Sequence, residues 1–462
     1  MVFSSTVFLF LFLPLVVLIY YNPIVKGQSF KNNFLLLASL LFYAWGEPIF
    51  VYLMILSIIV GWYIGKKIAA ASDKRRKKYY LTIGVVFHVG LFFIFKYLTF
   101  TLSQLGLILN ADLNFVNIAL PIGISFFTFQ LLSYLFDIYY GKAAAQESVL
   151  KVGLYIAFFP ALIAGPIVRY DHIAKEISQR QETIDDFCSG FMRFIYGLGK
   201  KVLIADLMAV LADNIFNAGI PDSIALAWLG AIAYTLQIYF DFSGYSDMAI
   251  GMARMFGFHL AENFNYPYIA KSATEFWRRW HISLGSWFRD YVYIPLGGNR
   301  VSMPRWILNL FIVWALTGIW HGANYTFLVW GLFYFVLLLI EKLTGFTEKL
   351  GILSHIYALA AIIIGWEIFR SENLGFAISY IKVMLGNGIL ADDRFYTYLT
   401  GSLSVLITAI ILSTPIMPYL QQKFKDNKAW NAAEPLLATG IFLLALIMCI
   451  SSTYNPFIYF NF

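Results

Sequence analysis

One histidine lies inside a long apolar stretch, where a titratable side chain is rare. His321 is the ionisable residue of the segment Asn309 to Ile340. A residue of this type inside a bilayer is costly and normally faces a cavity, which makes His321 a functional candidate. Its imidazole can remove a proton from a hydroxyl near neutral pH without a large pKa shift. The alternative is a core histidine that is hydrogen-bonded to a neighbouring helix.

Small and polar residues flank this histidine. Gly318 and Gly322 are spaced to share a helix face, which permits close helix contact or a narrow tunnel beside the imidazole. Asn324 is a polar neighbour that could orient or stabilise it. The basic residues before and after the stretch both favour the cytoplasm. We therefore expect a kinked or re-entrant helix pair that turns near Gly322 to Asn324 and holds His321 at mid-membrane depth.

A second segment alternates arginine and tryptophan at helical spacing. It contains His281 and candidate ligands for a phosphorylated donor, namely Arg278, Arg279, Trp280 and Arg289. Guanidinium groups match the geometry of phosphate oxygens. An amphipathic helix in the membrane interface would place them towards headgroups or an anionic ligand. The alternative is a cytoplasmic anchor without a ligand.

A third polar cluster interrupts the apolar run from 224 to 250. Asp241, Ser243 and Asp247 cannot face lipid without hydrogen-bond partners, so we expect them to support the site or line a tunnel. The alternative is buried hydrogen bonding between helices. Histidine pairs with metal-ligand spacing are missing, and Cys188 and Cys449 form no CxxC motif, so we expect no metal site.

The composition excludes an ordinary water-soluble protein. Of 462 residues, 60% are hydrophobic, 19% are aromatic and 13% are charged, whereas soluble domains are roughly 45–50% apolar and about 25% charged. The net charge of +7 comes from short basic runs between apolar stretches. Membrane orientation explains these runs better than nucleic-acid binding does. The sequence predicts a multi-pass membrane protein that contacts lipids.

Apolar windows of spanning length predict an all-α bundle of about 11–13 transmembrane and re-entrant helices. We expect one integral membrane domain over residues 1–462. The seven basic residues between Lys66 and Lys78 place that loop in the cytoplasm. Counting from this loop, both chain termini and the loop Thr99 to Asn117 should lie outside. The candidate spans are 4–22, 33–46, 48–65, 80–98, 118–139, 151–168, 189–216, 224–250, 306–340, 353–369, 397–417 and 435–452.

Several motifs together resemble one family. Trp277 to Leu284 (WRRWHISL), followed by Trp320 to Gly322, resembles the signature of membrane-bound O-acyltransferases. The remaining matches run end to end and are similar to the bacterial alginate O-acetylase branch. They are Met1 to Ser5, Ala44 to Gly46, Pro121 to Phe126, Ala164 to Ile167, Asp241 to Asp247 and Asn455 to Phe460.

The resemblance carries expectations about activity. It implies a ring of helices around a thinned centre with opposed funnels, a catalytic His321 and a second family histidine at His281. It implies acetyl-coenzyme A as donor substrate with no bound cofactor, in the bacterial cytoplasmic (inner) membrane. An esterase-like partner outside would acetylate an alginate-like polysaccharide. The alternatives are a peptidoglycan O-acetylase subunit, a teichoic-acid D-alanyl transferase and, outside the enzymes, a transporter of a lipid-linked intermediate.

Overall fold

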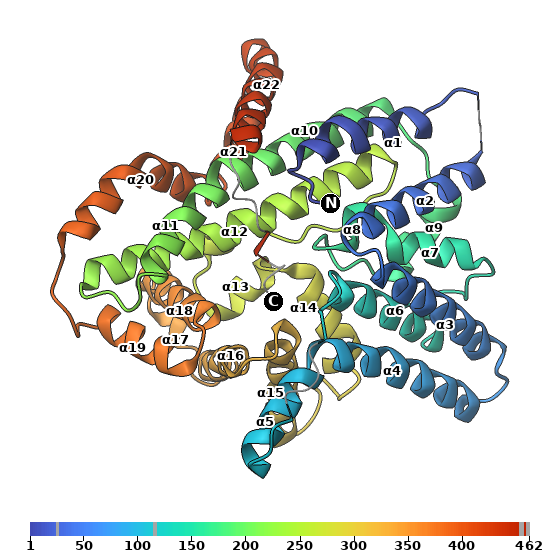
Figure 1. Cartoon of the computed structure of the whole chain (residues 1–462), viewed down its shortest axis with the longest axis horizontal. Coiled ribbons are helices and arrows are strands. Elements are labelled where there is room, and N and C mark those ends of the chain that lie inside the picture. The colour runs from blue at the N-terminus through green and yellow to red at the C-terminus, as the bar shows by residue number, and fades with distance from the viewer. Residues whose placement is uncertain (25–26, 114–117, 452–456, 459–462) are drawn as a thin grey trace. The chain divides into compact units, whose positions relative to one another are not determined.

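The computed structural model describes residues 1–24, 27–113, 118–451 and 457–458. The chain groups into two compact units. Unit 1 comprises Met1–Phe194 and Ser246–Ala261, and unit 2 comprises Ile195–Tyr245 and Glu262–Phe462. Helices make up the regular structure of the described residues, with an isolated bridge between Ser223 and Ile389 (Figure 1). Both candidate catalytic histidines belong to unit 2.

Unit 1 is a bundle of apolar helices joined by short turns. Glycines let α3 pack closely on α6, since a methyl group at Gly65 would lie 2.6 Å from the ring of Tyr134. The helices of this unit are η1 (Phe8–Phe12), α1 (Leu13–Tyr20), α2 (Gln28–Gly46), α3 (Phe50–Ala70), α4 (Lys74–Lys96), α5 (Leu98–Leu109), α6 (Ile124–Tyr139), α7 (Val149–Ala157), α8 (Phe159–Leu162), α9 (Tyr170–Gln179) and most of α10 (Ile184–Gly199).

Unit 2 holds most of the long helix α12 (Ile224–Met255) and the helices that follow it. The others before the catalytic region are η2 (Lys200–Ala205), α11 (Asp206–Phe216) and η3 (Pro267–Ile269). The catalytic region contains α13 (Ala273–Arg279), α14 (Ile282–Phe288), η4 (Arg289–Tyr293), α15 (Met303–His321) and α16 (Tyr325–Thr344). The chain continues through α17 (Phe346–Lys349), α18 (Leu353–Arg370), α19 (Leu374–Met384), α20 (Asp393–Leu412), α21 (Ile416–Lys423) and α22 (Lys428–Ser451).

The helices confirm a multi-pass membrane protein. Within the described residues, eight helices are long and apolar enough to cross a membrane, and four shorter ones are also apolar. Two expectations about individual segments were wrong. The expected loop Thr99 to Asn117 contains α5, apart from residues 114–117, which lie outside the description. The expected span 151–168 is divided into α7 and α8, because Pro160 lacks the amide hydrogen that a continuous helix needs.

The predicted turn after His321 is confirmed. Helix α15 ends at His321, α16 begins at Tyr325, and the two helices form an extensively packed hairpin. A methyl group at Gly318 would lie 2.5 Å from the carbonyl oxygen of Phe327, so this glycine permits the close contact. The prediction that Gly322 lies on the same helix face as Gly318 was wrong. Gly322 follows the helix in an extended conformation, because the chain turns directly after the imidazole.

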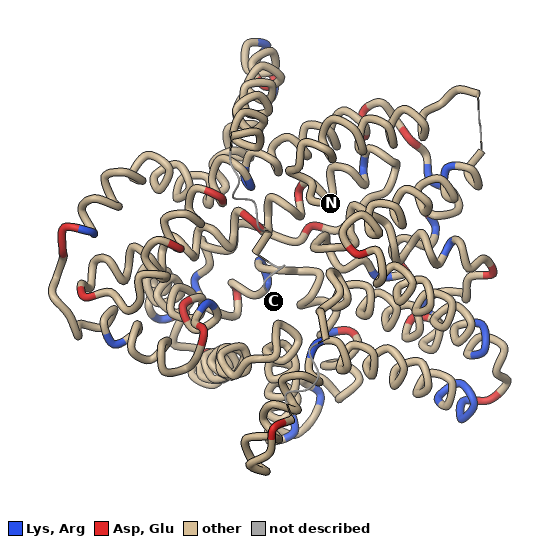
Figure 2. Tube along the Cα trace, viewed as in Figure 1, with Lys and Arg blue, Asp and Glu red and all other residues tan. Residues whose placement is uncertain are grey.

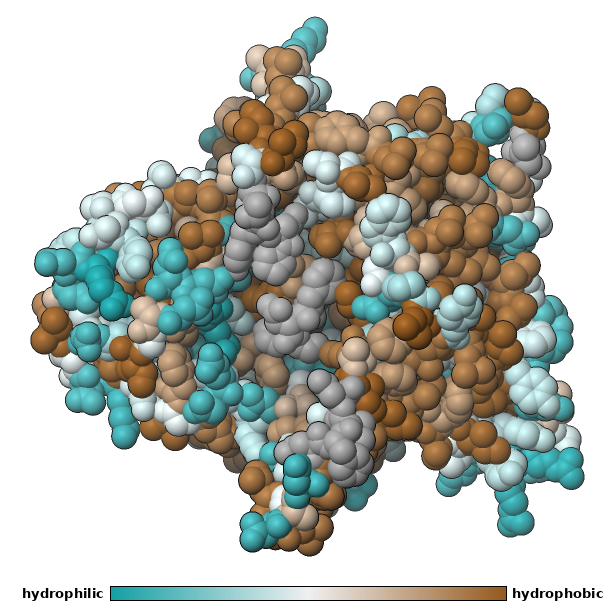
Figure 3. All heavy atoms as spheres, in the orientation of Figure 1, coloured by the Kyte–Doolittle hydropathy of each residue, from teal (hydrophilic) through white to brown (hydrophobic). Residues whose placement is uncertain are grey.

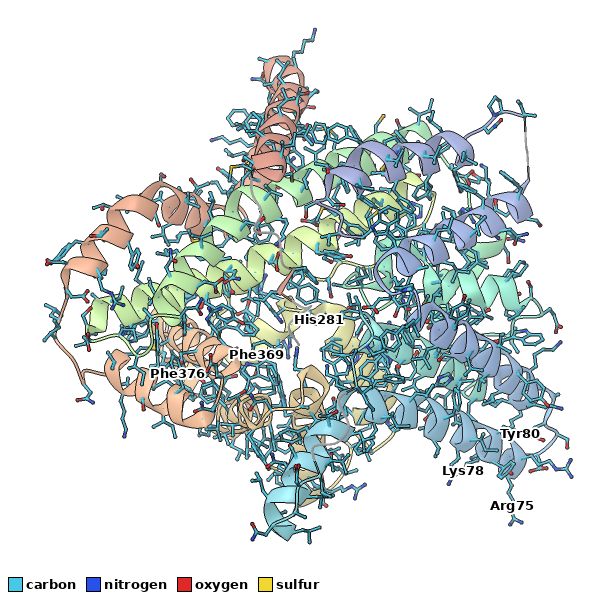
Figure 4. All side chains as sticks on the ribbon, in the orientation of Figure 1. Arg75, Lys78, Tyr80, His281, Phe369 and Phe376 are labelled. Atoms are coloured by element: carbon cyan, nitrogen blue, oxygen red, sulfur yellow. The ribbon has the colours of Figure 1, made fainter. Side chains whose placement is uncertain are left out.

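The basic loop lies at one end of unit 1. Lys and Arg gather where α3 and α4 meet (Figure 2), and Arg75 and Lys78 project away from the helices (Figure 4). Apolar side chains cover most of the face of unit 1 that is visible in Figure 3. An apolar helix surface that ends in a cationic loop is the pattern expected at a cytoplasmic membrane boundary.

Candidate active site

His321 lies in an aromatic environment at the end of α15. Its side chain is buried, and its ring centroid lies 4.9 Å from that of Trp330 and 5.0 Å from that of Phe369. Trp330 comes from α16 and Phe369 from α18 (Figure 4 labels Phe369). Three helices therefore surround the imidazole with rings that exclude bulk water and hold its orientation.

His281 occupies the kink between α13 and α14. Its backbone is left-handed, with φ of 44° and ψ of 53°, a conformation that costs a non-glycine residue of order 1–3 kcal/mol. The imidazole is buried, and burial lowers the pKa of His281 to about 3, so the ring is neutral. Its Nδ1 lies 3.1 Å from Oδ1 of Asn263. Its Nε2 has no hydrogen-bond partner within the described part of the chain.

One tryptophan connects the two histidines. The Trp320 ring centroid lies 4.9 Å from that of His321 and 6.0 Å from that of His281. Phe242 of α12 contacts the other side of this region, with a T-shaped ring distance of 4.7 Å to His281. The structure thus brings both predicted catalytic residues into one aromatic cluster, although they are far apart in the sequence.

A carboxylate from α16 fixes the start of α13, the helix that leads to His281. Glu341 is buried, and it accepts hydrogen bonds from the backbone amides of Ala273 (2.7 Å) and Thr274 (2.9 Å). It also accepts from the hydroxyls of Thr274 (2.6 Å) and Tyr357 (3.0 Å). The carboxylate satisfies amide groups that the first turn of a helix leaves free.

Replacing Glu341 with glutamine is expected to destabilise unit 2 by about 2 kcal/mol, because an amide supplies one acceptor oxygen and faces several donors. Thermal unfolding of the purified variant would measure the loss. Glu275→Gln is the control, since Glu275 is half-exposed and pairs with Arg279 at 2.9 Å. The Glu275→Gln control should lower the free energy of unfolding by less than about 1 kcal/mol. Equal stability of both variants would contradict this account of Glu341.

The arginine-rich segment forms short broken helices instead of one amphipathic helix. Arg279 donates to Glu275 and to the carbonyl oxygen of Asn265, and Arg289 pairs with Asp290. Trp280 is buried, and its ring centroid lies 4.7 Å from that of Trp366. The kink turns this side chain inward, so it cannot contact a ligand at the surface. Arg278 is exposed, and of the four proposed donor ligands it is best placed to meet an anion.

Asp241 belongs to a buried charge cluster. It pairs with Nζ of Lys201 at 2.8 Å, and Lys201 also pairs with Asp206 at 2.6 Å. The backbone amide of Ile458 donates to Asp241 at 2.7 Å. The neighbouring Phe457 contacts Tyr245 at 4.5 Å between ring centroids. Asp241 therefore holds the chain near its carboxyl end against α12; the rest of the matched motif 455–460 lies outside the described residues.

The remaining predicted residues are placed differently. Ser243 is buried on α12. Asp247 belongs to unit 1, where it pairs with Arg193 at 2.7 Å, so it is not grouped with the histidines. Asn324 caps α16 by accepting from the amide of Thr326, and it donates to the carbonyl oxygen of Glu372. The Asn324 amide thereby fixes the hairpin turn beside His321.

The buried polar residues of unit 2 that sequence reasoning missed include Lys201, Asn263, Glu341 and Glu367. Lys201 and Glu367 lie within predicted spans, so the rarity of charged residues there was a usable signal. Asn263 and Glu341 gave no such signal, because their importance depends on a kink and a helix start. No group of residues suited to a metal ion occurs in the described ranges.

Comparisons with known proteins point to one enzyme family. The family model of the membrane-bound O-acyltransferases matches residues 41–361. A probable alginate O-acetylase of Pseudomonas aeruginosa is 42% identical over 92% of this chain and 81% of its own length. One from Pseudomonas putida is 37% identical over the full length of both chains. A peptidoglycan O-acetyltransferase of Helicobacter pylori is 35% identical over 100% of this chain and 98% of its own.

The chain belongs to the membrane-bound O-acyltransferase family. It is a multi-pass membrane enzyme that transfers acyl groups to hydroxyls, as the sequence predicted.

Proposed function

We propose that this enzyme takes an acetyl group from acetyl-coenzyme A on the cytoplasmic side and delivers it for O-acetylation of an alginate-like polysaccharide outside. Support comes from the full-length similarity to a probable alginate O-acetylase. The observation that carries the chemistry is the pair of buried histidines whose rings both lie near the ring of Trp320. His281 and His321 are 2% and 5% exposed, so bulk water has little access to either imidazole in this structure.

His321 acts as the general base in this proposal. Its imidazole accepts the proton of an acceptor hydroxyl while the hydroxyl oxygen attacks the thioester carbonyl carbon. The new C–O bond forms as the C–S bond breaks, and the departing thiolate takes the proton from the imidazolium. His281 assists as the second histidine of the cluster, while Gly318 and Gly322 let Phe327 of α16 pack closely beside the end of α15.

Arg278 attracts the phosphates of the donor. It lies exposed on α13, three residues before His281. Within the described residues, no carboxylate pairs with it as Glu275 pairs with Arg279 and Asp290 with Arg289.

Reversing the charge with Arg278→Glu is expected to raise KM for acetyl-coenzyme A about tenfold, since a phosphate contact of this kind is worth on the order of 1.5–3 kcal/mol. Initial rates at varied donor concentration would measure this. Arg300→Glu is the matched control, an exposed arginine of the same segment. An unchanged KM in the Arg278 variant would favour a simple membrane anchor.

The location and partners follow from the same proposal. The enzyme resides in the bacterial inner membrane with the Lys66 to Lys78 loop in the cytoplasm and both termini outside, as one integral domain. An esterase-like acetyltransferase receives the acetyl group at the outer face and places it on the polymer. Cysteine labelling of the Lys66 to Lys78 loop from either side of intact cells tests this orientation.

Peptidoglycan is the second candidate acceptor. The Helicobacter pylori relative, a peptidoglycan O-acetyltransferase, matches along the whole chain. The experiment measures base-labile acetyl esters on purified exopolysaccharide and on purified cell wall, in cells with and without the gene. It decides between the two candidate acceptor polymers. Loss of esters from the exopolysaccharide alone is the expected result, and loss from the cell wall alone would overturn the choice of polymer.

A further inference from the structure

Asn263 lies in the extended segment that crosses the kink between α13 and α14. Its carbonyl oxygen accepts from the amide of Ile282 at 3.0 Å, and its Oδ1 accepts from the amide of Ser283 at 3.2 Å. Two residues further on, the amide of Asn265 donates to the carbonyl oxygen of Arg279 at 2.9 Å. These bonds hold His281 in its left-handed conformation from both sides.

The orientation of the Asn263 amide is determined by a backbone group. The amide of Ser283 can only donate, so the atom of Asn263 that faces it must be the oxygen. The Ser283 hydroxyl donates to the same oxygen at 2.8 Å. Because a hydroxyl has one hydrogen, Oγ of Ser283 has none left for Nδ1 of His281, which lies 3.4 Å away.

Both polar atoms near Nδ1 of His281 are therefore acceptors. The hydrogen bond of 3.1 Å to Oδ1 of Asn263 requires a proton on Nδ1. A neutral imidazole carries one proton, so Nε2 must present a lone pair. This atom is buried and has no hydrogen-bond partner in the described ranges.

We infer that Asn263 is a positioning residue that fixes the Nδ1-protonated tautomer of His281, so that Nε2 serves as a hydrogen-bond acceptor for a substrate hydroxyl. The tautomer follows from geometry alone, and the role towards substrate rests on the proposed function. In this tautomer His281 can accept a proton at Nε2 but cannot donate one there. It therefore aligns the hydroxyl that His321 deprotonates, and it does not stabilise the oxyanion.

Nitrogen-15 NMR of the full-length protein, labelled at its six histidines, tests the tautomer directly. The unprotonated ring nitrogen resonates far downfield of the protonated one, and His281→Gln assigns the signal. We expect Nε2 to be the unprotonated nitrogen in the wild type. A protonated Nε2 in the neutral ring would overturn the inference whether or not the enzyme transfers acetyl groups.

Three variants separate positioning from a merely structural role. Asn263→Ala should give a mixture of tautomers and lower kcat about 10²-fold, within the range of general acid–base catalysis. Asn263→Asp keeps the acceptor and should restore the tautomer and much of kcat. Ser283→Ala removes only the hydroxyl. It should change the tautomer ratio and kcat less than Asn263→Ala does. A loss of activity in Asn263→Ala with an unchanged tautomer, or no rescue by aspartate, would contradict the inference.

Discussion

Replacing His321 with alanine or glutamine is expected to reduce O-acetylation by about 10²–10⁴-fold, the typical contribution of a general base. The imidazole is the titratable group enclosed by the rings of Trp320, Trp330 and Phe369. Glutamine approximates its size and polarity but cannot accept a proton near neutral pH. The measurement is the ester content of the polymer in cells that contain equal amounts of each variant in the membrane.

His88→Gln is the matched control for this experiment. His88 is also a buried histidine within an apolar helix, α4, but it belongs to unit 1. Its replacement removes a similar buried ring and should leave most of the acetylation. If His321→Gln retained wild-type activity, or if both variants lost activity equally, the assignment of His321 as the base would be wrong.

Replacing Lys201 with methionine is expected to destabilise the protein by about 3–5 kcal/mol, because Asp206 and Asp241 would lose their common buried cation. Lys201 is 2% exposed, so water cannot compensate. The same change should loosen the backbone at Ile458, whose amide donates to Asp241. Thermal unfolding in detergent measures the first effect, and hydrogen exchange near Ile458 measures the second.

Lys66→Met provides the comparison for Lys201. Lys66 pairs with Glu147 at 2.7 Å, but their side chains are 41% and 84% exposed. Such pairs contribute roughly 0–1 kcal/mol. Equal destabilisation by the two substitutions would show that burial is not the source of the Lys201 effect.

The helices and the turn after His321 could be predicted because each depends on a local property. Apolar length predicts spans, and basic residues on both sides of Asn309 to Ile340 predict the hairpin that α15 and α16 form. The short helices α5 and α19 escaped prediction. At 12 and 11 residues, both are shorter than the roughly 20 residues that cross a bilayer.

The residues that hold the histidine site in place could not be predicted in the same way. Asn263 and Glu341 act on a kink and a helix start that are separated from them in sequence by 18 and 68 residues. Nothing in the sequence distinguishes these two side chains, because only the fold places them beside buried amides. Asp241 and Asp247 belong to one sequence motif, yet Asp247 pairs with Arg193 in unit 1 and Asp241 pairs with Lys201 in unit 2.

Transfer of isotopic label from acetyl-coenzyme A tests the central claim most directly. Inverted membrane vesicles that contain the polysaccharide and the outer partner would receive [¹⁴C]acetyl-coenzyme A on their exposed cytoplasmic face. Base-labile label should appear on the polysaccharide with the wild-type enzyme and stay at background with His321→Gln. Label that reaches the polymer equally in both, or in neither, would contradict an enzyme that transfers acetyl groups from this donor through His321.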